Sequence, residues 1–342
     1  QISVGDIKAG QGDTLGAHSA YQRSLDIAEA LARADPSNLQ ALRDVSVSLI
    51  KVGDIKAAQG DAQGALNAFQ RGLDIAETRA KADPSNARAQ RDVFVTLISV
   101  GDIKAAGGDE RGALDSYLRS LDIAETLAKS DPSNAQALRD VSVSFIKLGD
   151  IKVAQGDLPG ALCAFQSSLG ITENIAKSDP SNAQALRDVL LSLQRVGDIK
   201  GAQGDAQGAL SAYQSSLDTA QTLARADPSN SMALRDVSVN MNRIGHIKAL
   251  LGDTEAALRA FQGCLDIAET LAQADSSNSL ALRDLWVSHA KLWQLATEHS
   301  VERNHASEID RIFSELESRS ARISPSDCEF WTQVQQWLKD HP

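Results

Sequence analysis

Residues 86–132 read NARAQRDVFVTLISVGDIKAAGGDERGALDSYLRSLDIAETLAKSDP, and this stretch decides the fold. Its first half carries apolar residues at helical spacing, including Val93 and Leu97. Asn86 is a suitable N-cap, since its side chain can accept a hydrogen bond from the free N–H groups of a first helical turn. Glycines 107 and 108 end this helix, because glycine tolerates the left-handed backbone conformation found there. A brief alternation of Val and Ser elsewhere lies inside the same longer helical pattern, so we expect no strand.

The second half of the stretch predicts another helix. Asp109 can cap it, and its charge meets the positive end of the helix dipole. One apolar stripe then includes Ala113, Tyr117 and Ala124 at helical spacing. Asp131 ends the helix because it precedes a proline, which pushes it out of the α region. Residues 86–132 are therefore predicted to form a pair of antiparallel helices.

This unit recurs along the chain with a constant period of 48 residues, from Gly5-Asp6 to Gly53-Asp54 and onward. Such a period is typical of a solenoid of stacked repeats. We expect an all-α fold of about 15 helices in antiparallel pairs, with a solenoid over residues 1–298 and a divergent last helix plus a capping helix over 299–342. The repeat registers begin near residues 1, 39, 87, 135, 183, 231 and 279.

The unit resembles the tetratricopeptide repeat. The resemblance rests on a glycine in the first helix, Gly-Asp in the turn, an alanine and an aromatic residue in the second helix, and Asp-Pro at the end. In one unit these are Gly53, Gly60-Asp61, Ala65, Phe69, the small Gly72 and Asp83-Pro84. The unit of 48 residues is longer than the family's usual unit of about 34, and each helix can gain seven residues without turning its buried stripe. The resemblance, to a bacterial type with extended repeats, implies a right-handed superhelical solenoid that binds a protein segment on the concave face of its first helices.

Composition and motifs argue against several other functions. The chain of 342 residues has a net charge of −11, without the basic stripe that a nucleic-acid-binding protein needs. Three widely spaced cysteines suggest a reducing compartment, and we expect a cytoplasmic protein with no membrane contact. We expect no catalysis, cofactor or metal: the glycines near Gly10 follow no strand, and the residues Glu298, His299, Glu302 and His305 are interpreted as a solvated turn.

The candidate binding residues lie on the predicted first helices of the repeats, which would carry an arginine row, an apolar row and an aspartate row. Arg43 and Asp54 are eleven residues apart, so both point the same way. An alternative remains open, in which each arginine pairs with an aspartate of the next repeat, such as Asp92 or Asp140. The candidate residues are Arg91, Val95, Asp102, Arg139, Val143, Ile146, Asp150, Arg187, Leu191, Gln194, Asp198, Arg235, Val239 and Asn242.

One position changes character along the array, from Ile98 and Ile146 to Gln194 and Asn242. We therefore expect the ligand, a protein or peptide of unknown identity, to lie across the third to fifth units. Because the sequence opens inside a repeat, we expect the array to be the sensor or docking arm of a larger protein. The alternative function is self-association, through the terminal repeats or through the last helix with Trp331 and Trp337.

Overall fold

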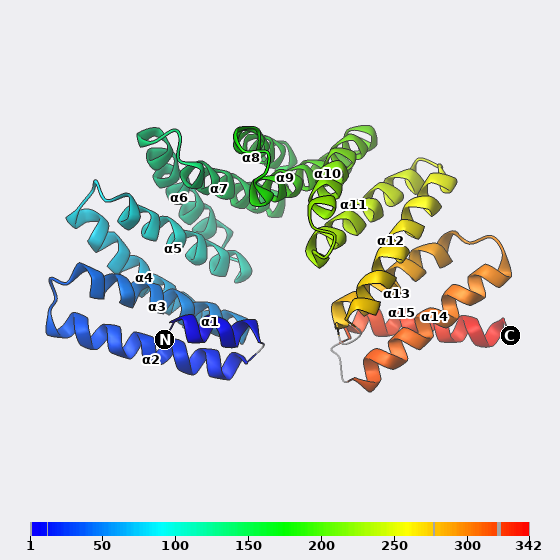
Figure 1. Cartoon of the computed structure of the whole chain (residues 1–342), viewed down its shortest axis with the longest axis horizontal. Helices are drawn as coiled ribbons and strands as arrows, with labels where there is room; N and C mark the ends of the chain where they lie inside the picture. Colours follow the sequence, from blue (N-terminus) through cyan, green and yellow to red (C-terminus); the bar gives the residue numbers. More distant parts are fainter. Residues whose placement is uncertain (1, 12, 276–277, 320–322, 342) are drawn as a thin grey trace. The chain divides into compact units, whose positions relative to one another are not determined.

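A computed structural model describes residues 2–11, 13–275, 278–319 and 323–341 (Figure 1), and in these ranges it contains fifteen helices and no strand. The predicted all-α fold of paired helices is confirmed. The helices are α1 (Ile2–Gly10), α2 (Thr14–Ala34), α3 (Leu39–Ala58), α4 (Ala62–Ala82), α5 (Ala87–Ala106), α6 (Glu110–Ser130), α7 (Ala135–Ala154), α8 (Leu158–Ser178), α9 (Ala183–Ala202), α10 (Ala206–Ala226), α11 (Ser231–Leu250), α12 (Thr254–Ala274), α13 (Ser279–Leu295), α14 (His299–Ser318) and α15 (Pro325–Asp340). We call the odd-numbered helices α1 to α13 the A helices, and α2 to α14 the B helices.

The helices begin and end where the side chains predict. Asn86 accepts a hydrogen bond from the backbone N–H of Ala89 at 3.0 Å at the start of α5. Asp109 does the same for Gly112 at 2.9 Å at the start of α6. Between them Gly108 has φ = +81°, the left-handed conformation that favours glycine. The predicted caps and the glycine turn are confirmed.

Within each repeat, a glycine of the A helix makes room for the aromatic residue of the B helix. A Cβ atom added to Gly101 would lie 2.4 Å from the ring of Tyr117, so even alanine would collide with it. Tyr117 is 3% exposed as a result, between its own A helix and the neighbouring repeat. The same pairing recurs as Gly5–Tyr21, Gly53–Phe69, Gly149–Phe165, Gly197–Tyr213 and Gly245–Phe261.

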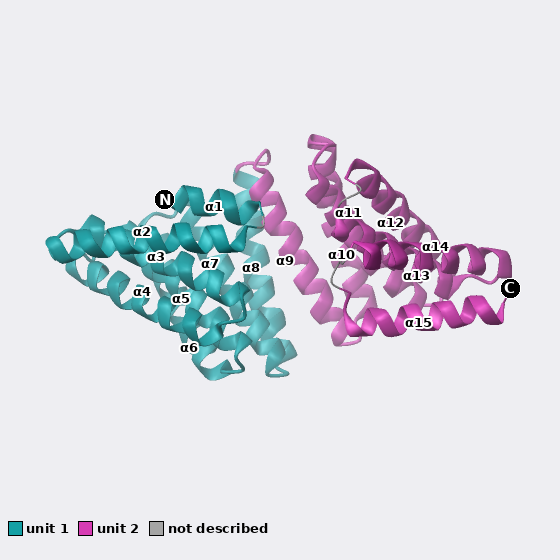
Figure 2. Cartoon of the chain, turned by 90° about the horizontal axis from the view of Figure 1, so that it is seen from below, with its two compact units in different colours: residues 1–178 teal, residues 179–342 magenta. Residues whose placement is uncertain are grey.

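The chain divides into two compact units (Figure 2), of which the first spans residues 1–178. In this unit, α1 to α8, each helix packs against the next along the chain. The small residue of the B helix lies against neighbouring A helices, where serines meet in hydrogen bonds. Ser120 and Ser144 lie 3.0 Å apart, and Ser142 and Ser168 lie 2.8 Å apart. These buried hydroxyls satisfy one another, so the helices approach closely without leaving polar atoms unpaired.

The second unit spans residues 179–342 and contains α9 to α15, again packed in chain order. Its C-terminal part is aromatic. The ring of Trp331 on α15 stacks on Phe313 of α14, with centroids 5.4 Å apart, and its Nε1 donates to Asp310 at 2.7 Å. Trp337 of the same helix meets Trp293 of α13 edge to face. The helix α15 therefore covers the last helix pair, as predicted for a capping helix.

The last B helix, α14, runs from His299 to Ser318, and one expectation about this C-terminal part needs correction. The interpretation of His305 as part of a solvated turn is wrong. His305 lies inside α14, is 9% exposed, and its Nδ1 is 2.9 Å from Nδ1 of His289 on α13. Its position within α14 places the His305 side chain in the core.

Candidate binding face on the A helices

The arginine row of the A helices binds the next repeat. Arg91 on α5 donates from Nε and Nη2 to the carboxylate of Asp140 on α7, at 2.7 and 3.2 Å. Asp140 is 3% exposed and also accepts from Gln136 at 2.8 Å. A buried carboxylate needs such partners, because removing it from water is costly. The predicted alternative, in which each arginine pairs with an aspartate of the next repeat, is confirmed for the pairs whose two residues lie in the same compact unit.

The same arrangement recurs in both units, each arginine reaching an aspartate 49 residues later. We call these pairs the Arg–Asp ladder. Its described members are Arg43–Asp92 and Arg91–Asp140 in the first unit, and Arg187–Asp236 and Arg235–Asp284 in the second. In the first unit Asp92 is also held by Arg79 of α4 at 2.7 Å. The guanidinium groups are thus fixed in place while part of each side chain stays accessible.

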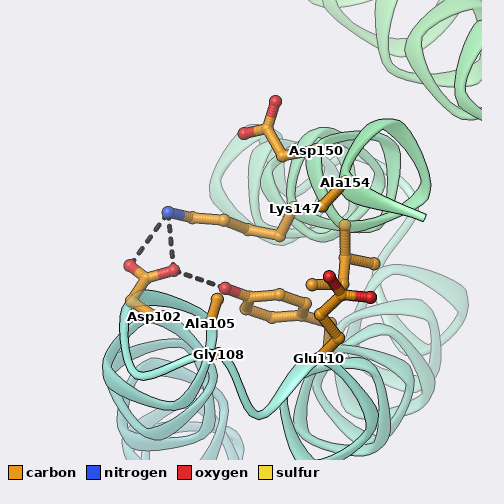
Figure 3. Close-up of a pocket in the computed structure, with 9 residues that line it drawn as sticks. Asp102, Ala105, Gly108, Glu110, Lys147, Asp150 and Ala154 are labelled. Carbon is orange, nitrogen blue, oxygen red and sulfur yellow. Dashed lines mark hydrogen bonds and ion pairs between the residues drawn. The ribbon is translucent and has the colours of Figure 1, made fainter. Parts of the chain in front are cut away.

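The aspartate row carries a second set of contacts that the sequence reasoning missed. The hydroxyl of Tyr117 donates to Asp102 at 2.7 Å, and Nζ of Lys147 on the next A helix lies 2.8 Å from the same carboxylate (Figure 3). Burial, followed by this hydrogen bond to Asp102, raises the pKa of the Tyr117 hydroxyl above its usual range. The tyrosine therefore stays a neutral donor.

Two other aspartates of the row are held in the same way. Asp6 accepts from Tyr21 at 2.8 Å and lies 3.0 Å from Nζ of Lys51. Asp198 accepts from Tyr213 at 2.7 Å and lies 3.2 Å from Nη2 of Arg243. In the sequence the signal is a basic residue 45 positions after the aspartate. We call an aspartate with its tyrosine and its basic residue an Asp–Tyr–cation triad.

In the first unit, the triad of Asp102 borders a cavity of about 330 Å³ between α5, α6 and α7 (Figure 3). Its wall includes the small side chains of Ala105 and Ala154, so the cavity is open down to the helices. Three carboxylates and one ammonium group line it, which leaves it acidic. The charged residues are Asp102, Glu110, Lys147 and Asp150.

In the second unit, a cavity of about 230 Å³ lies between α11 and α13. Three of the predicted binding residues line it, namely Arg235, Val239 and Asn242. It borders both an Arg–Asp ladder pair and the Arg243 of a triad. Each unit therefore has, on its A helices, a hollow that combines fixed charges with apolar side chains.

The fourteen predicted binding residues differ in exposure. Asp102 and Leu191 are exposed, whereas Gln194 is 8% exposed and belongs to the interior of its unit. The polar side chain of Gln194 therefore does not form part of an open surface. The other eleven are half-buried: Arg91, Val95, Arg139, Val143, Ile146, Asp150, Arg187, Asp198, Arg235, Val239 and Asn242.

No group of three or more His, Cys, Asp or Glu residues in the described part of the chain could hold a metal ion. Among the described helices, none has the length and apolar character needed to span a bilayer. Cys264 is buried in the small-residue position of α12, where its thiol donates to the carbonyl of Ser238 at 3.2 Å, and burial raises its pKa to about 11. This thiol is therefore held as an unreactive core group.

Residues 240–271, from the second half of α11 into α12, match the tetratricopeptide repeat family. This segment contains the glycine, the turn and the aromatic residue described above, and the remaining repeats share its register. This segment is a tetratricopeptide repeat. No curated protein sequence matches the chain.

Solved structures agree with this tetratricopeptide repeat fold at low sequence identity. BtubC from P. vanneervenii is 16% identical, with 76% of this chain and 91% of that chain covered and a TM-score of 0.58. The nuclear import adaptor Nro1 of S. pombe is 12% identical, with 86% and 99% covered and a TM-score of 0.55. The apo form of RapI is 11% identical, with 95% and 82% covered and a TM-score of 0.54. At this identity the likeness concerns the fold.

Proposed function

We propose that this repeat protein is a non-catalytic scaffold that binds a segment of another protein on the A helices. The observation that carries the proposal is the cavity beside Asp102, in which the charged side chains of Asp102 and Lys147 are already held by intramolecular bonds. A site with fixed side chains loses little conformational entropy when a ligand binds. The cavity of the second unit beside Val239 and Asn242 supplies a comparable hollow.

The chemistry of this face favours a protein segment over a small substrate. Both cavities are shallow parts of long helical surfaces that present charged and apolar groups in turn. Surfaces of this kind match an extended or helical segment, which carries side chains at regular intervals. The negative net charge of the chain favours a neutral or basic partner.

The experiment is affinity capture of partners, followed by calorimetric titration of the captured partner in purified form. Ala105→Leu fills the cavity beside Asp102, and Asn242→Ile changes the cavity of the second unit. Ala106→Leu is the matched control, because Ala106 is exposed next to Ala105 and does not line the cavity. We expect at least a tenfold loss of affinity with Ala105→Leu or Asn242→Ile and none with the control. Equal affinity of all variants for the partner would move the binding site away from this face.

Self-association is the second candidate, and one observation favours it. Ile7 on α1 is 62% exposed and Leu15 on α2 is 76% exposed, whereas Ile55, equivalent to Ile7 one repeat later, is 7% exposed. A second copy could cover these apolar groups. Sedimentation equilibrium tests this: a concentration-dependent mass that Ile7→Ser with Leu15→Ser abolishes supports it, and a constant monomer mass contradicts it.

A further inference from the structure

The row of Asp–Tyr–cation triads in the first unit has a gap at Asp54. Asp6 and Asp102, one repeat before and one repeat after it, each bind a tyrosine hydroxyl and a lysine ammonium group. The positions that would serve Asp54 are occupied by Phe69 and Ser99. Phenylalanine has no hydroxyl and serine has no charge, so the sequence removes both partners at once.

The structure shows that nothing else in the described ranges replaces them. Ser99 donates its hydroxyl to the carbonyl of Val95 at 3.4 Å, so it is turned toward its own helix. Lys51, one turn before Asp54 on α3, places its Nζ 3.0 Å from Asp6. In residues 2–11, 13–275, 278–319 and 323–341, the carboxylate of Asp54 makes no hydrogen bond or ion pair.

Asp54 also lies in an environment where a bound cation stabilises its carboxylate. Its side chain is open to solvent on one side, while the surrounding protein atoms displace part of its water. This burial raises the pKa of the Asp54 carboxyl above its usual range, against the opposing effect of the Lys51 charge. Attraction between opposite charges is stronger in such a partly dehydrated place than on a fully hydrated surface.

We propose that Asp54 is an anchor site for a cationic side chain, lysine or arginine, of a bound protein segment. This inference rests on the proposed function and names the chemistry of its ligand. The incoming ammonium or guanidinium group takes the position that the basic side chain of the next repeat holds in each triad. The triads show both solutions, with lysine on Asp102 at 2.8 Å and arginine on Asp198 at 3.2 Å.

The missing side chain at position 99 leaves the approach open. Lys147, one repeat later, crosses from α7 to Asp102 on α5 (Figure 3). Ser99 lacks the three outer methylenes and the ammonium group of a lysine, so a side chain from outside can run along that path. Lysine and arginine stems pack well against apolar atoms while their charged ends stay in a polar environment. A single carboxylate provides too few ligands for a calcium ion, which takes 6–8 oxygens.

The test uses the whole chain with carbon-13-labelled aspartate and follows the carboxyl signals by NMR. The Asp54 signal is the one missing from the spectrum of Asp54→Asn. The probe is N-acetyl-lysine methylamide, with the arginine analogue as a second cation and the uncharged norleucine analogue as the control ligand. We expect the Asp54 signal to shift and saturate with both cationic probes, and to stay in place with the norleucine analogue.

A matched variant fills the gap from within the chain. Ser99→Lys restores the cation of the triad, so we expect it to weaken probe binding at Asp54 at least tenfold. Asp122→Asn is the charge control, since Asp122 is exposed on α6 and is expected to leave the titration unchanged. Circular dichroism confirms that each variant is folded. A linear, unsaturable shift, or equal binding by Ser99→Lys and by the wild type, would overturn the site.

The same variants separate this inference from the proposed function. If a captured protein partner binds Asp54→Asn and Ser99→Lys as tightly as the wild type, the anchor site is overturned while the scaffold function stands. If the cationic probes saturate Asp54 but no protein partner is captured, the cation site at Asp54 stands, and both the scaffold function and the assignment of that cation to a protein segment are overturned. A partner that binds both variants at least tenfold more weakly supports both proposals.

Discussion

Arg91 and Asp140 belong to consecutive repeats, and the guanidinium of Arg91 donates two hydrogen bonds to the buried Asp140 carboxylate, at 2.7 and 3.2 Å. This contact joins α5 to α7 across the B helix that lies between them in the sequence. Within each compact unit, the Arg–Asp ladder therefore ties consecutive A helices together, α3 to α5 and α5 to α7 in the first unit and α9 to α11 and α11 to α13 in the second. It fixes the charges of the proposed binding face and the stacking of the repeats with the same atoms.

We expect Arg91→Met to lower the free energy of unfolding by about 2 kcal/mol, because Asp140 loses two charge-assisted hydrogen bonds and stays buried. Urea unfolding followed by circular dichroism measures the change. Arg111→Met is the control, because Arg111 is exposed near the start of α6. We expect its effect to stay within about 0.5 kcal/mol. Equal stability of wild type and Arg91→Met would show that the ladder does not stabilise the stack.

Gly101→Ala tests the contact between the A helix and its aromatic residue. The new Cβ atom would lie 2.4 Å from the Tyr117 ring, which is closer than non-bonded atoms approach. We expect a loss of about 1–3 kcal/mol from overpacking. Gly170→Ala is the matched control, because no neighbouring atom lies within 4 Å of the added Cβ. In that helix alanine should stabilise by about 0.5–1 kcal/mol. Thermal unfolding of both variants gives opposite signs if the packing is as described.

The buried pair His289 and His305 predicts loss of stability at mildly acidic pH. Burial and the neighbouring His305 lower the pKa of His289 to about 4, whereas an unfolded histidine titrates near about 6.5. Between these values the unfolded chain binds more protons than the folded chain, so stability falls as the pH falls from about 6.5 to about 4. The full effect is on the order of 3 kcal/mol.

The measurement is urea unfolding across this pH range for the wild type and for His289→Leu. We expect the variant to lose much of the pH dependence in this window. If His289→Leu shows the same slope as the wild type, the pair is not the group that titrates.

Trp331→Ala distinguishes a capping helix from an interface helix. The indole stacks on Phe313 and donates to Asp310, so its removal should cost about 2 kcal/mol of stability, below the value for a fully buried tryptophan. We expect the mass in sedimentation equilibrium to remain unchanged. A variant that keeps its stability but changes its mass would assign Trp331 to self-association instead.

Much of the fold follows from short-range chemistry that is visible in the sequence. Asn86 and Asp109 begin helices and Gly108 ends one, because caps and left-handed turns depend on neighbouring residues only. The period then fixes the pairing of helices, since every unit repeats the same caps. The signal is weaker at the start of α14, because Glu298 makes no side-chain cap bond there and the repeat pattern has drifted.

The candidate site was predicted less completely, for a physical reason. Whether Arg91 binds a ligand or pairs with Asp140 depends on how two repeats stack. The sequence pattern within one repeat is the same in either case. The contact of Lys147 with Asp102 likewise needs the distance between two A helices. Gln194 was assigned to the open face by analogy with Ile146, but its side chain is 8% exposed, so polarity alone did not reveal its burial.

The spacing of the Arg–Asp ladder also bears on how such an array can change length. Each repeat contributes one arginine that binds the next repeat and one aspartate that binds the arginine of the repeat before it. A duplication of 48 codons, starting at any codon, adds one arginine and one aspartate of the ladder. A deletion of 48 codons removes one of each. Arrays of different length can therefore arise by recombination without leaving a buried charge unpaired.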